Sequence, residues 1–172
     1  MSAAATPSLT AVTRRLDRDV DLVRLAGSSG ILFALGRVGF AGRGVAARVG
    51  SSDLGDLLLS MEVDDDVDRV GTGPVAFAAL PFEPGGTYQA VVPSLVVGRD
   101  RDGVGWVTVV TEGDASTLDP VVALDRAISE SEGERDGHGG PSSFTVTASR
   151  DPEEWMAAVS AATARIATGR LE

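Results

Sequence analysis

The sequence contains no cysteine and no lysine, and these two absences exclude several kinds of chemistry. Without cysteine the chain can form neither a disulfide nor a thiolate nucleophile. All fifteen basic residues are arginine, so no side chain can form a Schiff base, act as a lysine general base or complete a G-x-x-x-x-G-K-[ST] phosphate loop. Asparagine is absent too, and Ala, Gly, Val, Asp and Arg dominate, as in proteins encoded by GC-rich DNA.

Long apolar runs and a basic N-terminus are also missing. No run reaches the ~18 to 20 residues that a membrane-spanning helix needs, and the N-terminus lacks the features of a signal peptide. The net charge is −10, which predicts repulsion from nucleic acid and from anionic membranes. We therefore expect a cytoplasmic protein that binds neither nucleic acid nor membrane. Its 172 residues suffice for one domain or part of a larger one.

Hydrophobic patterning predicts an α+β (mixed α/β) fold, with antiparallel hairpins and flanking helices in a layered arrangement. The expected helices cover 9–25, where a switch to a strand near Val20 stays open, a segment capped by Ser52 or Asp53 that runs to about Met61, a segment that starts at Asp119 or Asp114, and 151–168. The expected strands cover 31–35, 38–42, 45–49, 74–80, 90–97, 104–110 and 144–148. The remaining expectations are a disordered tail at 1–8, an acidic loop at 62–68 and a mobile loop at 130–141.

Two of these elements have especially clear signals. The runs at 90–97 and 104–110 flank a charged turn that ends in Asp102-Gly103, which indicates a β-hairpin. Pro93 suggests that the first of these runs lies at a sheet edge or contains a bulge. In the last helix, Asp151 is the expected N-cap, Pro152 stands at the first helical position and Gly169 is the expected stop.

An acidic cluster is the first group that could carry chemistry. Asp64, Asp66 and Asp68 alternate in the sequence as calcium ligands can. An EF-hand loop that starts at Asp64 would need Gly at its sixth position and Glu at its twelfth, where this chain has Arg69 and Val75. The pattern therefore favours a solvated acidic loop over a metal site.

The other candidates also have simpler structural interpretations. The glycines from Gly36 to Gly44 do not follow the dinucleotide-binding spacing and lie between strands, so they are expected in turns. His138, the single histidine, lies in a Gly-rich loop with no second His or Cys to complete a metal site. Trp106 and Trp155 lie on expected core faces. No residue is therefore predicted to be catalytic, cofactor-binding or metal-binding.

Several stretches together resemble the N-terminal part of isochorismate synthases, members of the chorismate-utilising family that includes anthranilate synthase component I. The most specific of them is Ala76-Phe-Ala-Ala-Leu-Pro-Phe-Glu-Pro84. The others match in order and spacing: Gly42-Arg-Gly-Val-Ala-Ala-Arg48, Val92-Pro-Ser-Leu-Val-Val-Gly-Arg99 with Trp106-Val-Thr108, Phe144-Thr-Val followed by Asp151-Pro-Glu-Glu-Trp155, and Ile166-Ala-Thr-Gly-Arg-Leu-Glu172. The resemblance runs from about residue 30 to the last residue and covers only the front portion of the family.

The resemblance implies conversion of chorismate to isochorismate, with Mg²⁺ as cofactor. In the family, a lysine general base activates water, a glutamic acid protonates the departing hydroxyl, and glutamates hold Mg²⁺. That lysine follows a Gly-x-Leu-x pattern, so it would come directly after Glu172. We therefore expect the chain to lack the catalytic C-terminal half, to bind no Mg²⁺ itself and to be inactive alone. The resemblance does not distinguish an enzyme that makes isochorismate for menaquinone from one that makes it for a siderophore.

Two alternatives remain at this stage. The chain could be a stand-alone, non-catalytic binding or interaction domain on the same scaffold. It could also belong to a salicylate, anthranilate or aminodeoxychorismate synthase. Tryptophan-inhibited members of the family carry an early Leu-Leu-Glu-Ser, whereas the nearest stretch here, Leu57-Leu-Leu-Ser60, lacks the Glu. This difference disfavours anthranilate synthase.

Overall fold

The computed structural model describes residues 8–83, 85–116, 118–136, 143, 145, 147, 149 and 151–169, with the backbone alone for 132–136. The chain divides into two compact units, Met1–His138 and Gly139–Glu172, and each is described by itself. Among the described residues, the first unit contains a six-stranded and a three-stranded sheet with three helices, and the second contains one helix. The fold is therefore α+β, as the sequence predicts.

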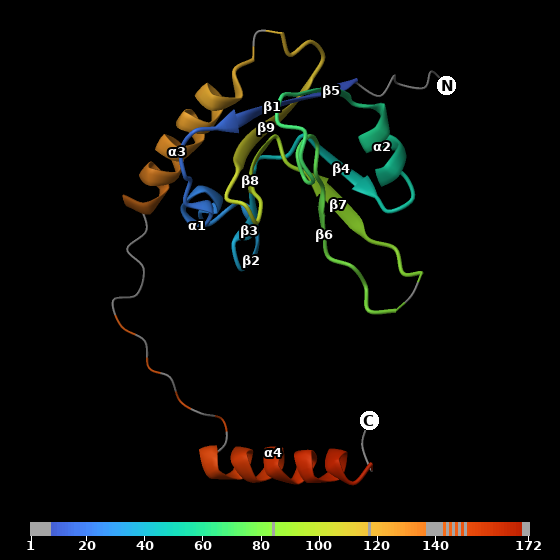
Figure 1. Ribbon diagram of the computed structural model, residues 1–172, viewed down its shortest axis with the longest axis vertical. Coiled ribbons are helices and arrows are strands. Elements are labelled where there is room, and N and C mark those ends of the chain that lie inside the picture. Colours follow the sequence, from blue (N-terminus) through green and yellow to red (C-terminus); the bar gives the residue numbers. More distant parts are fainter. Residues whose placement is uncertain are drawn as a thin grey trace. The chain divides into compact units, whose positions relative to one another are not determined.

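The larger sheet has the strand order β2-β3-β8-β9-β1-β5 (Figure 1). Its neighbours are antiparallel except for β1 and β5, which run parallel. This arrangement puts β2 and β5 at the edges. The strands are β1 (Leu9–Leu16), β2 (Ile31–Leu35), β3 (Val38–Arg43), β5 (Glu62–Asp65), β8 (Leu95–Arg99) and β9 (Gly105–Glu112).

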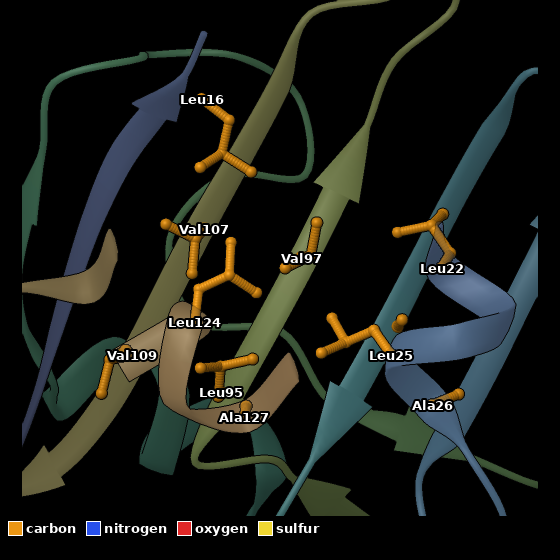
Figure 2. Close-up of a cluster of buried hydrophobic side chains, with 11 residues drawn as sticks. Leu16, Leu22, Leu25, Ala26, Leu95, Val97, Val107, Val109, Leu124 and Ala127 are labelled. Carbon is orange, nitrogen blue, oxygen red and sulfur yellow. The ribbon is translucent and has the colours of Figure 1, made fainter. Parts of the chain in front are cut away.

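Two helices, α1 (Leu22–Ala26) and α3 (Pro120–Asp136), cover one face of this sheet. Aspartate side chains cap both: Asp21 accepts from the Arg24 amide at 3.0 Å, and Asp119 accepts from the Val121 amide at 2.8 Å. Leu25 from α1 and Leu124 from α3 meet valines and leucines of β8 and β9 in a buried cluster (Figure 2). This cluster is the larger of the two cores.

A second layer covers the opposite face. It consists of α2 (Leu54–Ser60) and a small sheet of order β4-β7-β6, made of β4 (Ala47–Gly50), β6 (Phe77–Ala78) and β7 (Gln89–Val92). Met61 and Val92 pack there against Leu9, Ala11 and Val110 of the large sheet. The middle of the large sheet is therefore buried on both faces, which agrees with the largely apolar sequences of β8 and β9.

Several predicted elements are confirmed. The hairpin of β8 and β9 turns at Gly103, whose amide donates to the Asp100 carbonyl at 3.2 Å. The strands predicted at 31–35 and 38–42 are β2 and β3, and the one at 45–49 corresponds to β4. In the second unit, α4 (Pro152–Ala167) begins after Asp151, which accepts from the Glu153 amide at 2.8 Å, and is followed by Gly169 with a positive φ.

The helix predicted over 9–25 is wrong. Residues 9–16 form β1, which lies inside the sheet between β9 and β5, and only Leu22–Ala26 is helical. The apolar residues at positions 9, 12 and 16 match the helical period. Because both faces of β1 are covered, however, nearly every side chain of the strand is buried and the alternation typical of a strand is lost.

Other boundaries also differ from the predictions. Residues 62–65 of the acidic loop predicted at 62–68 form strand β5. Residues 130–136, also predicted as loop, are the end of α3. The buried strand predicted at 74–80 is reduced to the two residues of β6, neither of them buried. The run at 90–97 contains two strands, because the chain passes from the small to the large sheet at buried Pro93.

Some predictions fall on residues that the structure does not describe. The tail at 1–7 and the loop at 137–141 lie outside the described residues. Of the strand predicted at 144–148, only Thr145 and Thr147 are described, and neither belongs to a strand.

Candidate functional site

The acidic cluster pairs with arginine on the neighbouring strand. Arg14 of β1 donates from Nη2 to Asp64 Oδ2 at 2.6 Å, and its Nε lies 3.8 Å from Asp66 Oδ2. The hydrogen bond from Arg14 lowers the pKa of Asp64, and the same bond raises the pKa of Arg14. Asp66 Oδ1 also accepts from the Arg15 amide at 3.2 Å. These carboxylates thus attach β5 and the following turn to β1.

The remaining aspartates of this cluster shape a turn. Asp65 Oδ1 accepts from the backbone amides of Val67 at 2.9 Å and Asp68 at 3.3 Å. Asp68 itself has φ 50°, the left-handed conformation that aspartate adopts more readily than most residues. Within the described residues, no three His, Asp or Glu side chains are grouped so that they could hold a metal ion. The cluster that resembled calcium ligands in the sequence is therefore built as a structural turn.

The glycines from Gly36 to Gly44 serve turns and close packing. Gly36 and Gly44 have positive φ at the two ends of β3. Within the strand, a Cβ on Gly39 would lie 2.7 Å from Leu22 Cδ1, and one on Gly42 would lie 2.7 Å from Pro93 Cγ. This geometry agrees with the turn interpretation, and the helix α1 packs closely against β3 because Gly39 has no side chain.

Two clefts in the first unit are lined partly by arginine side chains. The first, of about 540 Å³, lies at the end of the sheet next to the loop that joins β1 and α1. There Arg99 Nη1 donates to Asp19 Oδ1 at 2.8 Å and its Nε donates to the Arg37 carbonyl at 3.1 Å. Arg18 pairs with Asp125 of α3. Ion pairing thus engages two of the arginines that line this cleft.

The second cleft, of about 620 Å³, lies between α3 and the sheet. Its lining includes the apolar side chains of Leu95 and Val109, and Arg43 donates from Nη1 to the Leu25 carbonyl at 3.3 Å. On α3, Arg126 and Glu130 form an ion pair with a distance of 2.9 Å. In these clefts, Arg18, Arg43 and Arg99 connect neighbouring elements of the first unit.

A buried polar group on the second face of the sheet was missed by sequence reasoning. The Thr13 and Thr108 hydroxyls, both fully buried, lie 2.9 Å apart, and the Gly73 amide donates to Thr13 Oγ1 at 3.2 Å. Next to them Trp106 is also buried, and its indole Nε1 has no hydrogen-bond partner in the part of the chain that the structure describes. Threonines at facing positions of two apolar strands were the only available signal. Trp106 is in the core as predicted, whereas Trp155 is not buried within its own unit.

Three of the stretches that carry the family resemblance, 42–48, 76–84 and 92–99, meet in the first unit. A Cβ on Gly42 would touch both Pro93 and Phe77, at 2.7 and 3.4 Å, so three separate stretches converge there. Ser94 Oγ donates to the Arg43 carbonyl at 3.2 Å beside the same point. The residues that resemble the family therefore build the passage between the two sheets.

Comparison with protein-family models, with curated proteins and with solved structures gave no match. Among the described residues, no helix is both long and apolar enough to cross a membrane. His138 lies outside the described residues, so the expectation that it belongs to no metal site stays a prediction.

Proposed function

We propose that the chain is the N-terminal part of an isochorismate synthase, a cytoplasmic enzyme that converts chorismate to isochorismate. The observation that carries this proposal is the meeting of Gly42, Phe77 and Pro93, which come from three stretches that resemble the family. Residues from distant stretches that constrain one another are expected when a resemblance reflects a shared scaffold. The isochorismate formed by the proposed enzyme would supply the synthesis of menaquinone or of a siderophore.

An exposed apolar edge of the large sheet also supports the proposal. Leu32, Phe33 and Leu35 of the edge strand β2 are 42%, 51% and 72% exposed. An edge strand without charged residues is unusual on a protein surface, because it invites pairing with other strands. In the proposed enzyme, the remainder of the catalytic domain covers this strand, and the edge is not free.

The described residues do not fit the family's Mg²⁺ site. The carboxylates closest to a metal pattern, Asp64 and Asp66, are engaged by Arg14 and by the Arg15 amide. We therefore assign no step of the reaction to this chain. Its role in the proposal is to form part of the sheet-and-helix shell around a site whose lysine, glutamic acid and metal ligands belong to the C-terminal half.

An activity assay on two proteins tests the proposal. One is the 172-residue chain, and the other is the same chain extended by the amino acids that its coding frame specifies beyond codon 172. With chorismate and Mg²⁺, we expect isochorismate only from the extended protein. A stop codon directly after codon 172, or an extended protein that leaves chorismate unchanged, would refute the proposal. Formation of salicylate, anthranilate or aminodeoxychorismate instead would keep the family and change the reaction.

A second candidate is a stand-alone, non-catalytic interaction domain on the same scaffold. Two separate buried clusters within the first unit favour it, because they provide cores on both faces of the large sheet. This candidate predicts that the 172-residue chain is monodisperse and unfolds in one cooperative transition. A molten, aggregating chain would count against it.

A further inference from the structure

Residues 66–73, here called the strap, connect β5 to the segment before β6 and lie against the second face of the large sheet. Gly71 packs on two aromatic rings: a Cβ there would lie 2.8 Å from Phe40 Cζ and 3.5 Å from Trp106 Cζ2. Those two rings contact each other edge to face, with centroids 6.0 Å apart. The strap thus covers the indole that is buried beneath it.

Polar contacts fasten the strap at its middle and at its C-terminal end. In the middle, Arg69 Nη1 lies 3.1 Å from Asp100 Oδ2 and 2.9 Å from Asp102 Oδ2, both in the turn between β8 and β9. At the C-terminal end, the Gly73 amide donates to the buried Thr13 hydroxyl. Between these contacts Val70 is 97% exposed, so the tip of the strap buries no apolar side chain. The ion pairs are solvent-accessible and are therefore weak and sensitive to salt.

The closed position leaves a polar group without a partner. Trp106 Nε1 is buried and has no hydrogen-bond acceptor among the described residues. A buried donor that lacks an acceptor destabilises the state that buries it, because water would satisfy the same group. The closed strap is thus favoured by Arg69 and disfavoured by the indole N–H that it helps to bury.

We propose that the strap is a releasable cover over Trp106, held closed by the ion pairs of Arg69 with Asp100 and Asp102. Release admits water to the indole N–H and to the Thr13 and Thr108 hydroxyls without unfolding the sheet. Local opening of this kind is expected where a segment buries little apolar surface. This inference does not depend on the proposed function, since it concerns only contacts within the first unit.

Hydrogen exchange measured by NMR on the full chain tests the proposal. The reporters are the Gly73 amide and the Trp106 indole N–H, and Trp155→Phe serves as the background so that a single indole signal remains. Loss of both ion pairs in Arg69→Gln is expected to raise the exchange rate of both reporters about fivefold while β9 backbone amides keep their rates. In the parent protein, 0.5 M NaCl should have the same effect, and Arg69→Gln should respond little to salt.

Arg126→Gln is the matched control, because it removes an exposed arginine whose ion pair with Glu130 lies on α3, away from the strap. It should leave both reporters unchanged. The proposal is wrong if Arg69→Gln and Arg126→Gln exchange alike, or if the two reporters exchange only together with the β9 amides. Should Arg69→Gln not fold, the salt titration of the parent decides alone: reporters that salt does not accelerate relative to β9 overturn the proposal.

Discussion

The indole of Trp106 occupies the space in which a side chain on Gly98 would stand. The two residues are cross-strand partners in β8 and β9, and a Cβ on Gly98 would lie 2.4 Å from Cε2 and 2.6 Å from Nε1 of the indole. Trp106 is 1% exposed and has Phe40 on another side, so it has little room to move away. The absence of a side chain at Gly98 is therefore a condition for placing the tryptophan.

The first prediction follows from this contact. Gly98→Ala should lower the free energy of unfolding by about 1–3 kcal/mol, the usual cost of overpacking a core. Gly55→Ala is the control, because a Cβ on Gly55 meets no atom within 4 Å and Gly55 lies in α2. There alanine should raise stability by about 1 kcal/mol through its higher helix propensity. Urea denaturation of both variants measures the difference, and equal effects would contradict the packing argument.

The second prediction concerns the buried threonine pair. Thr13→Val leaves both the Gly73 amide and the Thr108 hydroxyl without their partner, whereas Thr108→Val removes only one of the two contacts of Thr13. We expect a loss of about 1–3 kcal/mol for Thr13→Val and a smaller loss for Thr108→Val, because unpaired buried groups carry most of the cost. Thermal and urea unfolding measure both values. A larger loss for Thr108→Val would show that the Gly73 contact is unimportant.

Local signals predicted those parts of the fold that are determined by neighbouring residues. Asp102-Gly103 marks the turn of the β8–β9 hairpin, and Asp151-Pro152 marks the start of α4, since each motif satisfies backbone geometry within a few residues. The layers on both sides of the sheet are not encoded locally. For this reason the spacing of Leu9, Val12 and Leu16 suggested a helix where the chain forms the buried strand β1.

Long-range contacts also explain the other differences. The largely charged residues 62–65 form a strand because they pair with β1, about fifty positions earlier in the sequence, where Arg14 also contacts Asp64. Pro93 suggested a sheet edge or a bulge, but the residue lies where the chain passes from the small sheet to the large one. Predicting such a passage requires knowing where both sheets lie. At the level of the site, the sequence predicted no catalytic residue and placed Trp106 in the core, but it did not predict the hydrogen-bonded pair of Thr13 and Thr108 beside it.

The third prediction uses the Arg14–Asp64 ion pair. The hydrogen bond from Arg14 holds the pKa of Asp64 below its ordinary value in the folded state. A carboxylate with a lowered folded pKa stabilises the protein above its unfolded pKa, and this contribution disappears as the pH falls through the folded pKa. Asp64→Asn should therefore reduce stability at neutral pH and lessen the loss of stability below about pH 4.

Urea unfolding between pH 7 and pH 2 measures this difference. Glu62→Gln is the matched control, because it removes a carboxylate from the same strand but leaves the Arg14 contact with Asp64 intact. The argument fails if the parent and Asp64→Asn lose stability with the same dependence on pH.

The fourth prediction separates the two proposed functions through the exposed edge strand. Leu35 is 72% exposed, so Leu35→Lys should change the stability of the 172-residue chain by no more than about 0.5 kcal/mol and should reduce self-association. If the rest of an enzyme covers β2, the same substitution should destabilise the extended protein and lower its rate of isochorismate formation, because a charge would then be buried.

Leu25→Lys is the control for this comparison, since Leu25 is 1% exposed in the larger core and the charge should disrupt folding in both proteins. Thermal melting, light scattering and the chorismate assay give the three measurements. An effect of Leu35→Lys confined to the extended protein would support the enzyme proposal, because only a covered edge strand can make that substitution costly. Equal tolerance in both proteins would mean that β2 remains a free edge, as an independent interaction domain requires.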